Sequence, residues 1–184
     1  SDLVEGDLSQ ESYTYSGEEF CPGVTILYGE EALQEGIDYS VSYRNNVNAG
    51  SAEEADAPAV IISGMGTYYG ELLIPFTILP KKLNSKEAAL QQKKIGVNDY
   101  TTAQLQAGLK VNATVTDKKN KSLADVKFML TDGVDYEIVC TDNDTVGEAV
   151  ATIKGIGNYT GEVVLKFTIE GINLAKITFD KIPT

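Results

Sequence analysis

The sequence AVIISGMGTYYGELLIPFTI, from Ala59 to Ile78, has a close counterpart in VATIKGIGNYTGEVVLKFTI, from Val150 to Ile169. The two segments align without gaps at an offset of 91 residues, and nine of their twenty positions are identical. An earlier pair, GIDYSVSYRNNVNAG from Gly36 and GVDYEIVCTDNDTVG from Gly133, recurs at an offset of 97 residues. Two blocks that recur in the same order predict a duplicated domain.

The duplication predicts domain boundaries in this chain of 184 residues. The first domain is expected at residues 1–80 and the second at 81–170, which is a usual length for small domains. Residues 171–184 form either a tail or the start of a truncated third repeat, because 175–179 (AKITF) again reads as a strand. The six extra residues of the first copy fall near Ser51–Pro58, whose composition suits a solvated loop.

Strand signals dominate both copies. Val24–Tyr28 is β-branched and aromatic, and Tyr39–Tyr43 alternates so that every second side chain shares a face. Leu72–Ile78 is a further strand, which Pro75 restricts to a sheet edge or a bulge because proline cannot donate to the ladder. Short strands separated by frequent turns predict an all-β fold made of two tandem antiparallel sandwiches.

Two stretches of the sequence predict helix and not strand. The run from Asn84 to Lys94 predicts a short linker helix, since Asn84 and Glu87 have capping-box spacing and lysines occupy the last turn. Thr101–Ala107, which precedes Gly108, could form a second helical turn.

The sharpest local pattern is G-x-G-x-Y-x-G, which occurs once in each copy. Its members are Gly64, Gly66, Tyr68 and Gly70 in the first copy, and Gly155, Gly157, Tyr159 and Gly161 in the second. We interpret it as a hairpin in which alternate glycines leave a trough for the tyrosine ring and the last glycine supplies an unusual φ. A phosphate-binding loop is disfavoured, because such a loop needs a helix after the glycines and strand-like residues follow here.

With these motifs, the chain resembles repeats found in bacterial cell-surface proteins. The resemblance covers nearly all of the first copy and the second from Gly133 onward; no comparable segment stands before Val115. It is carried by YSG at 15–17, PGVTI at 22–26, GIDY at 36–39, NNVNAGSA at 45–52, and the glycine–tyrosine hairpin with its FTI ending. It implies tandem immunoglobulin-like modules that lie outside the cell, secreted or wall-associated, and that space or present other domains without catalysis.

Composition narrows the chemistry further. The chain has no histidine, which removes the usual general base and the commonest metal ligand, so we predict no enzyme activity, no metal site and no cofactor. The recurring Asp38 and Asp135, each followed by a tyrosine (Tyr39 and Tyr136), are expected to serve the fold of each copy. Asp142–Asp144 lacks the spacing of a calcium loop and is interpreted as a polar turn. Cys21 and Cys140 are expected to be small, partly buried residues.

The net charge of −12 disfavours nucleic acid as a partner, and no apolar run is long enough to insert into a membrane. The leading hypothesis is therefore a structural or adhesion segment, monomeric within a longer chain. The alternative is a carbohydrate- or protein-binding module that contacts a host glycan, a matrix protein or a cell-wall polymer. Its candidate contacts are Tyr68, Tyr69 and Tyr159, and only Tyr69 is free of a packing role, since Thr160 replaces it in the second copy.

Overall fold

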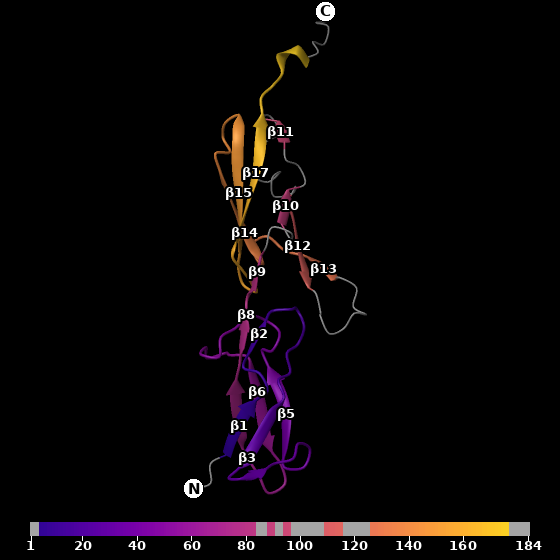
Figure 1. Cartoon of the computed structure of the whole chain (residues 1–184), viewed down its shortest axis with the longest axis vertical. Helices are drawn as coiled ribbons and strands as arrows, with labels where there is room; N and C mark the ends of the chain where they lie inside the picture. The colour runs from indigo at the N-terminus through magenta and orange to yellow at the C-terminus, as the bar shows by residue number, and fades with distance from the viewer. Residues whose placement is uncertain (1–3, 84–87, 91–93, 97–108, 116–125, 177–184) are drawn as a thin grey trace, which may run out of the picture. The chain divides into compact units, whose positions relative to one another are not determined.

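The fold consists of short β-strands. The computed structural model describes residues 4–83, 88–90, 94–96, 109–115 and 126–176 (Figure 1). Within these ranges the only helical element is the 3-10 turn η1 (Leu174–Lys176), so the predicted all-β class is confirmed. The chain divides into two compact units. Unit 1 comprises Ser1–Lys82 with Gly157–Thr160, and unit 2 comprises Leu83–Ile156 with Gly161–Thr184.

Unit 1 contains two antiparallel three-stranded sheets and two short parallel pairs. The first sheet has the order β1-β3-β4, the second has the order β5-β6-β7, and the parallel pairs are β2 with β8 and β9 with β16. The strands are β1 (Val4–Leu8), β2 (Ser12–Thr14), β3 (Val24–Tyr28), β4 (Glu31–Ala32), β5 (Tyr39–Arg44), β6 (Ala59–Gly64), β7 (Glu71–Pro75), β8 (Thr77–Leu79), β9 (Lys81–Lys82) and β16 (Tyr159–Thr160).

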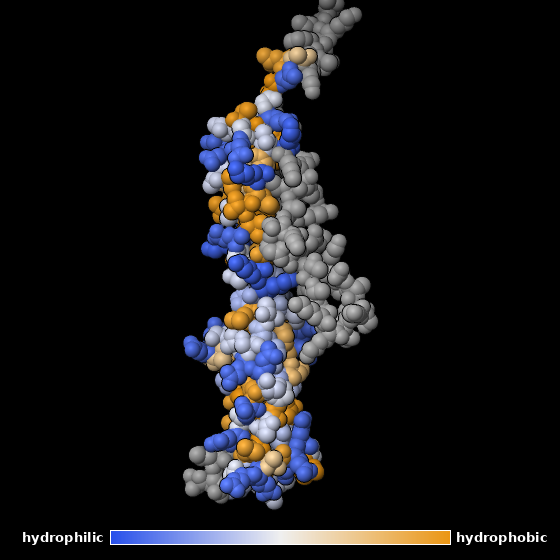
Figure 2. All heavy atoms as spheres, viewed as in Figure 1, coloured by the Kyte–Doolittle hydropathy of each residue, from blue (hydrophilic) through white to orange (hydrophobic). Residues whose placement is uncertain are grey.

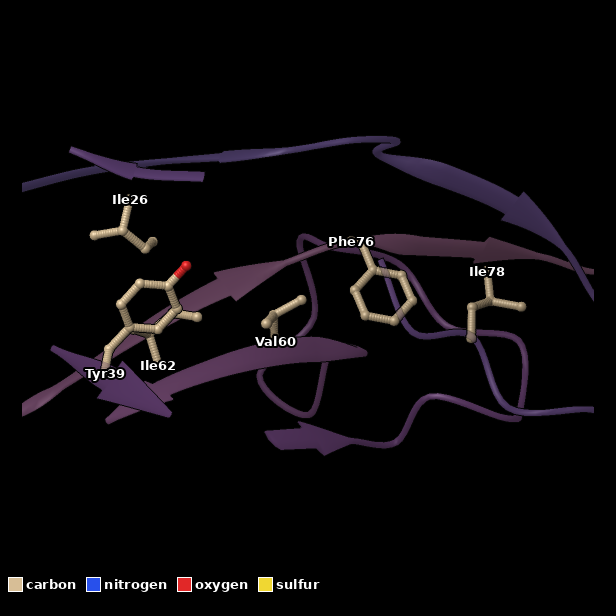
Figure 3. Packing of buried hydrophobic residues seen from close by; sticks show 6 residues of the cluster. All are labelled: Ile26, Tyr39, Val60, Ile62, Phe76 and Ile78. Carbon is tan, nitrogen blue, oxygen red and sulfur yellow. The ribbon is translucent and has the colours of Figure 1, made fainter. Parts of the chain in front are cut away.

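The core of unit 1 draws on both sheets. Ile26 of β3 belongs to the same buried cluster as residues of β5, β6 and the β7–β8 segment (Figure 3). The members of this cluster are Ile26, Tyr39, Val60, Ile62, Phe76 and Ile78. Tyr39 lies on the inward face of β5 that the alternation predicted, and period-2 patterning therefore fixes which side chains of β5 are buried. In β6 the adjacent Ala59 and Val60 are both buried, so its burial does not follow a period of two.

Pro75 ends one strand and allows the chain to change partner. β7 is the edge strand of its sheet, as predicted for a strand that contains proline. After Phe76, whose N–H donates to the Pro58 carbonyl at 2.8 Å, β8 pairs in parallel with β2. The second copy has Lys166 in place of Pro75 and runs on as one strand, β17 (Glu162–Glu170).

Unit 2 is built around the four-stranded sheet β11-β17-β15-β14. Its strands are β11 (Lys94–Gly96), β14 (Tyr136–Thr141), β15 (Gly147–Gly155) and β17, and the smaller sheet contains β10 (Ala88–Leu90), β12 (Leu109–Val115) and β13 (Val126–Met129). Buried side chains of the four-stranded sheet include Ile153, Phe167 and Ile169. Val139 and Val164 are exposed, and Figure 2 shows hydrophobic surface where β15 and β17 lie.

The predicted linker helix is wrong where the structure describes it. Ala88–Leu90 forms strand β10, which pairs antiparallel with β12, and Lys94 opens strand β11. Pairing with strands distant in the chain has overridden a local capping signal. The rest of that run (84–87 and 91–93), and the second helical turn predicted at 101–107, lie outside the described residues.

Two further expectations need correction. Ala175 and Lys176, predicted to begin a strand, lie in η1, where the Ala175 N–H donates to Asn173 Oδ1 at 3.0 Å. An asparagine side chain that captures a nearby N–H favours a turn over a strand. The loop at Ser51–Pro58 is exposed only in part, because Ala57 and Pro58 are buried in unit 1.

Candidate functional site

The loop before β5 is organised by a carboxylate. Asp38 Oδ2 accepts a hydrogen bond from the Gln34 N–H at 2.8 Å, and the Gly36 N–H donates to the Tyr39 carbonyl at 2.7 Å. The loop before β14 repeats this arrangement. There, Asp135 Oδ2 accepts from the Thr131 N–H at 2.8 Å, and the Gly133 N–H donates to the Tyr136 carbonyl at 2.8 Å. Each aspartate thus stabilises a turn by accepting a hydrogen bond from a backbone N–H four residues earlier in the chain.

The tyrosines that follow these aspartates begin β5 and β14 and are almost fully buried. Tyr39 and Tyr136 are each 5% exposed. Burial raises the pKa of the Tyr39 hydroxyl, and the negative charges of Glu35 and Asp38 raise this pKa further. Burial also raises the pKa of the Tyr136 hydroxyl, and the negative charges of Asp132 and Asp135 raise this pKa further. Both hydroxyls therefore remain protonated at neutral pH.

The glycine–tyrosine hairpins also share their backbone geometry. The Gly64 N–H donates to the Gly70 carbonyl at 2.9 Å, and the Gly155 N–H donates to the Gly161 carbonyl at the same distance. Gly70 and Gly161 adopt φ values of 89° and 83°, which side chains with a Cβ rarely tolerate. The corresponding turn glycines, Gly66 and Gly157, have φ values of 62° and 60°.

The contact at Gly64 differs from the predicted trough for a tyrosine ring. A Cβ on Gly64 would lie 2.7 Å from the Tyr69 backbone N and 2.8 Å from the Tyr68 carbonyl carbon. Glycine is therefore needed for the close approach of two backbone segments. The Tyr68 ring instead meets Tyr28 edge-on, with a centroid separation of 6.0 Å.

The three candidate tyrosines lie in different environments. Tyr69 is 96% exposed, Tyr68 is half-buried and Tyr159 is only 5% exposed. Burial removes Tyr159 from the set of possible ligand contacts, whereas Tyr68 and Tyr69 both line a pocket of unit 1. Tyr28, at the end of β3, lines the same pocket and was not found from the sequence. The one feature of the sequence that could have pointed to Tyr28 is its position, as an aromatic residue at the end of a predicted strand and directly before Gly29.

This pocket, which we call the tyrosine pocket, has a volume of about 740 Å³, within the usual range for small-ligand sites. Ile26 and Ile62, both buried, form part of its apolar lining. Asp38 and Glu71 contribute the carboxylates. In the described part of the chain, no group of three or more histidine, cysteine, aspartate or glutamate side chains could hold a metal ion.

Neither cysteine lines the tyrosine pocket. Cys140 is half-buried as expected, and its burial raises the pKa of its thiol. Cys21 is exposed, contrary to the expectation, with Asn46 Nδ2 at 3.8 Å from its sulfur. Both thiols are free.

Comparison with protein-family models, with curated proteins and with solved structures finds no match to this chain. Across the described ranges, none of the helical structure has the length and apolarity needed to traverse a bilayer.

Replacing Asp38 with alanine should lower the free energy of unfolding by about 1–2 kcal/mol, because the Gln34 N–H loses its acceptor. Asp38→Asn keeps an acceptor oxygen and should lose less than half of that amount. Urea unfolding of both variants measures the difference. Equal stability of Asp38→Ala and the unmodified protein would contradict the structural role of this carboxylate.

Proposed function

We propose that this chain is a non-catalytic segment of a bacterial cell-surface protein, formed by two tandem immunoglobulin-like sandwich modules. Its role is mechanical: the modules space other domains of the same protein or present them to the surroundings. On this proposal the segment lies outside the cell, secreted or wall-associated, and is monomeric within a longer chain.

One observation carries the proposal, which is the recurrence of the same local geometry in two units. The aspartate-held loop recurs with hydrogen bonds of the same length, at Asp38 and at Asp135. Buried Phe76 and Phe167 occupy equivalent places in the recurring sequence. Asn45 and Asp142, which follow the equivalent strands, adopt φ values of 50° and 55°.

The pairing of the last strands recurs as well. Thr77–Leu79 pairs in parallel with β2, and Thr168–Glu170 pairs in parallel with β11. In each unit an early strand, β2 or β11, therefore pairs in parallel with a later strand, β8 or β17. Load that pulls two such paired strands in opposite directions would shear several hydrogen bonds at once, which suits a mechanical role.

Stretching single molecules of the whole chain between its two ends tests this proposal. We expect two unfolding events, each releasing roughly 30 nm at about 3.6 Å per residue. A single event, or extension without resistance, would contradict two load-bearing modules. Protease treatment of intact producing cells tests the location, because a surface segment should be cleaved while cytoplasmic markers survive.

A further inference from the structure

The acidic charge of the chain is concentrated in its first part. Residues 1–82 contain fourteen acidic and three basic side chains, which gives a formal net charge of −11 out of −12 for the whole chain. A surface of one sign raises the local concentration of ligands of the opposite sign. Unit 1 is therefore the part of the chain that attracts cations.

The tyrosine pocket of unit 1 combines this charge with aromatic rings. Tyr28 is 39% exposed and meets Tyr68 edge-on, and Tyr69 is almost fully exposed beside them. Tyrosine faces attract ammonium and guanidinium groups within about 6 Å of the ring centroid. The described residues that line the pocket include no lysine or arginine.

Two carboxylates in the pocket retain unused acceptor capacity. Asp38 engages the Gln34 N–H through Oδ2, and Glu71 accepts from Ser63 Oγ through Oε1 at 3.4 Å. Neither of the remaining oxygens, Asp38 Oδ1 and Glu71 Oε2, has a hydrogen bond to a residue of the described ranges. An ammonium group has three donors that these oxygens could accept.

Tyr39 adds a buried polar group. Its side chain is 5% exposed. Figure 3 shows this hydroxyl directed toward Ile26, and both residues line the pocket.

We infer that the tyrosine pocket binds a lysine side chain of a basic peptide segment, with the aliphatic stem against the apolar lining. The ammonium group lies among the rings of Tyr28, Tyr68 and Tyr69 and hydrogen-bonds to the carboxylates of Asp38 and Glu71. The second copy lacks this site, because Thr160 replaces Tyr69 and Tyr159 is buried. The inference is independent of the mechanical role, which would stand if the pocket bound nothing.

The test is an NMR titration of the whole chain with the pentapeptide GKGKG, blocked at both ends. We expect saturable shifts of the amides of Asp38, Thr67, Tyr69 and Glu71, weakened by added salt. The matched probe is the same peptide with both lysines acetylated on Nε, which keeps the stem and removes the charge. It should bind at least about fivefold more weakly.

Two pairs of variants separate local contacts from general charge. Tyr69→Ala should raise the dissociation constant about fivefold, whereas Met65→Ala, in the same hairpin but outside the pocket, should leave it unchanged. Glu71→Gln should raise it about threefold, whereas Glu53→Gln makes the same change in net charge at an exposed site outside the pocket and should have little effect.

Three outcomes would overturn the inference. The acetylated peptide could bind as tightly as the charged one, or Tyr69→Ala could leave binding unchanged. Cellobiose or chitobiose could saturate the same amides while the lysine peptide does not, which would make the pocket a glycan site. Tyr69 is exposed, so its replacement should leave the fold intact, and the amide spectrum of the variant verifies this.

Discussion

Phe76→Ala should lower the free energy of unfolding by about 3–5 kcal/mol, because it leaves a cavity at the centre of the unit 1 core. The side chain is fully buried and lies edge-on to Tyr13, with ring centroids 5.8 Å apart. It also belongs to the cluster that links β3 with β5 and β6, so little of the surrounding structure can collapse into the space. For a small domain this loss is a large part of the total stability.

Urea unfolding followed by tyrosine fluorescence measures the effect, since the chain has ten tyrosines and no tryptophan. Hydrogen exchange shows which unit is destabilised, because the amides of β5–β7 in unit 1 should lose protection before those of β14, β15 and β17 in unit 2. The control is Leu79→Ala, at a side chain that is 49% exposed, which should cost less than about 1 kcal/mol. Equal losses for the two variants would show that Phe76 is not a core residue.

The sequence predicts the strands of the core well, because burial on one face imposes a period of two. Tyr39 and Val41 of β5 alternate with exposed serines in the structure as they do in the pattern. Period, β-branching and turn residues are local properties, and local properties are what a sequence displays directly.

What the sequence could not predict depends on partners distant in the chain. Ala88–Leu90 is helix-forming by composition, yet it pairs with Leu109–Val111, and no local pattern encodes that pairing. Ala57 and Pro58 are buried at the end of the loop, where the Pro58 carbonyl accepts a hydrogen bond from the Phe76 N–H, a contact that composition does not reveal.

The residues of the candidate site likewise include some that the sequence predicted and one that it did not. Tyr69 was found because the two copies differ there, and Asp38 because they agree. Tyr28 was missed because it enters the tyrosine pocket only when β3 lies beside the Tyr68 hairpin, as their ring contact shows. A pocket forms only in the tertiary structure. From the sequence, a residue that lines it could be identified only where comparison of the two copies singled that residue out.

Gly64→Ala should cost about 3 kcal/mol, although the position lacks the positive φ that usually makes glycine irreplaceable. The new Cβ would overlap the backbone of Tyr68 and Tyr69, and backbone cannot move aside as a flexible side-chain end can. Because Tyr68 and Tyr69 of this hairpin line the tyrosine pocket, their amide shifts should change together with stability.

Substitutions at two other glycines distinguish the cost of steric overlap from the cost of backbone strain. Gly70→Ala meets nothing within 4 Å but must adopt a φ of 89°, so strain alone should cost about 1–2 kcal/mol. A Cβ at Gly23 would meet only the Ser9 side chain, with Oγ at 3.5 Å and Cβ at 3.8 Å, which are ordinary contacts. Gly23→Ala should therefore change the free energy of unfolding by less than about 0.5 kcal/mol. The order Gly64, Gly70, Gly23 in urea unfolding is the expected result. If Gly64→Ala proved as mild as Gly23→Ala, the close approach of the two backbone segments would be wrong, and the recurring glycine would need another explanation.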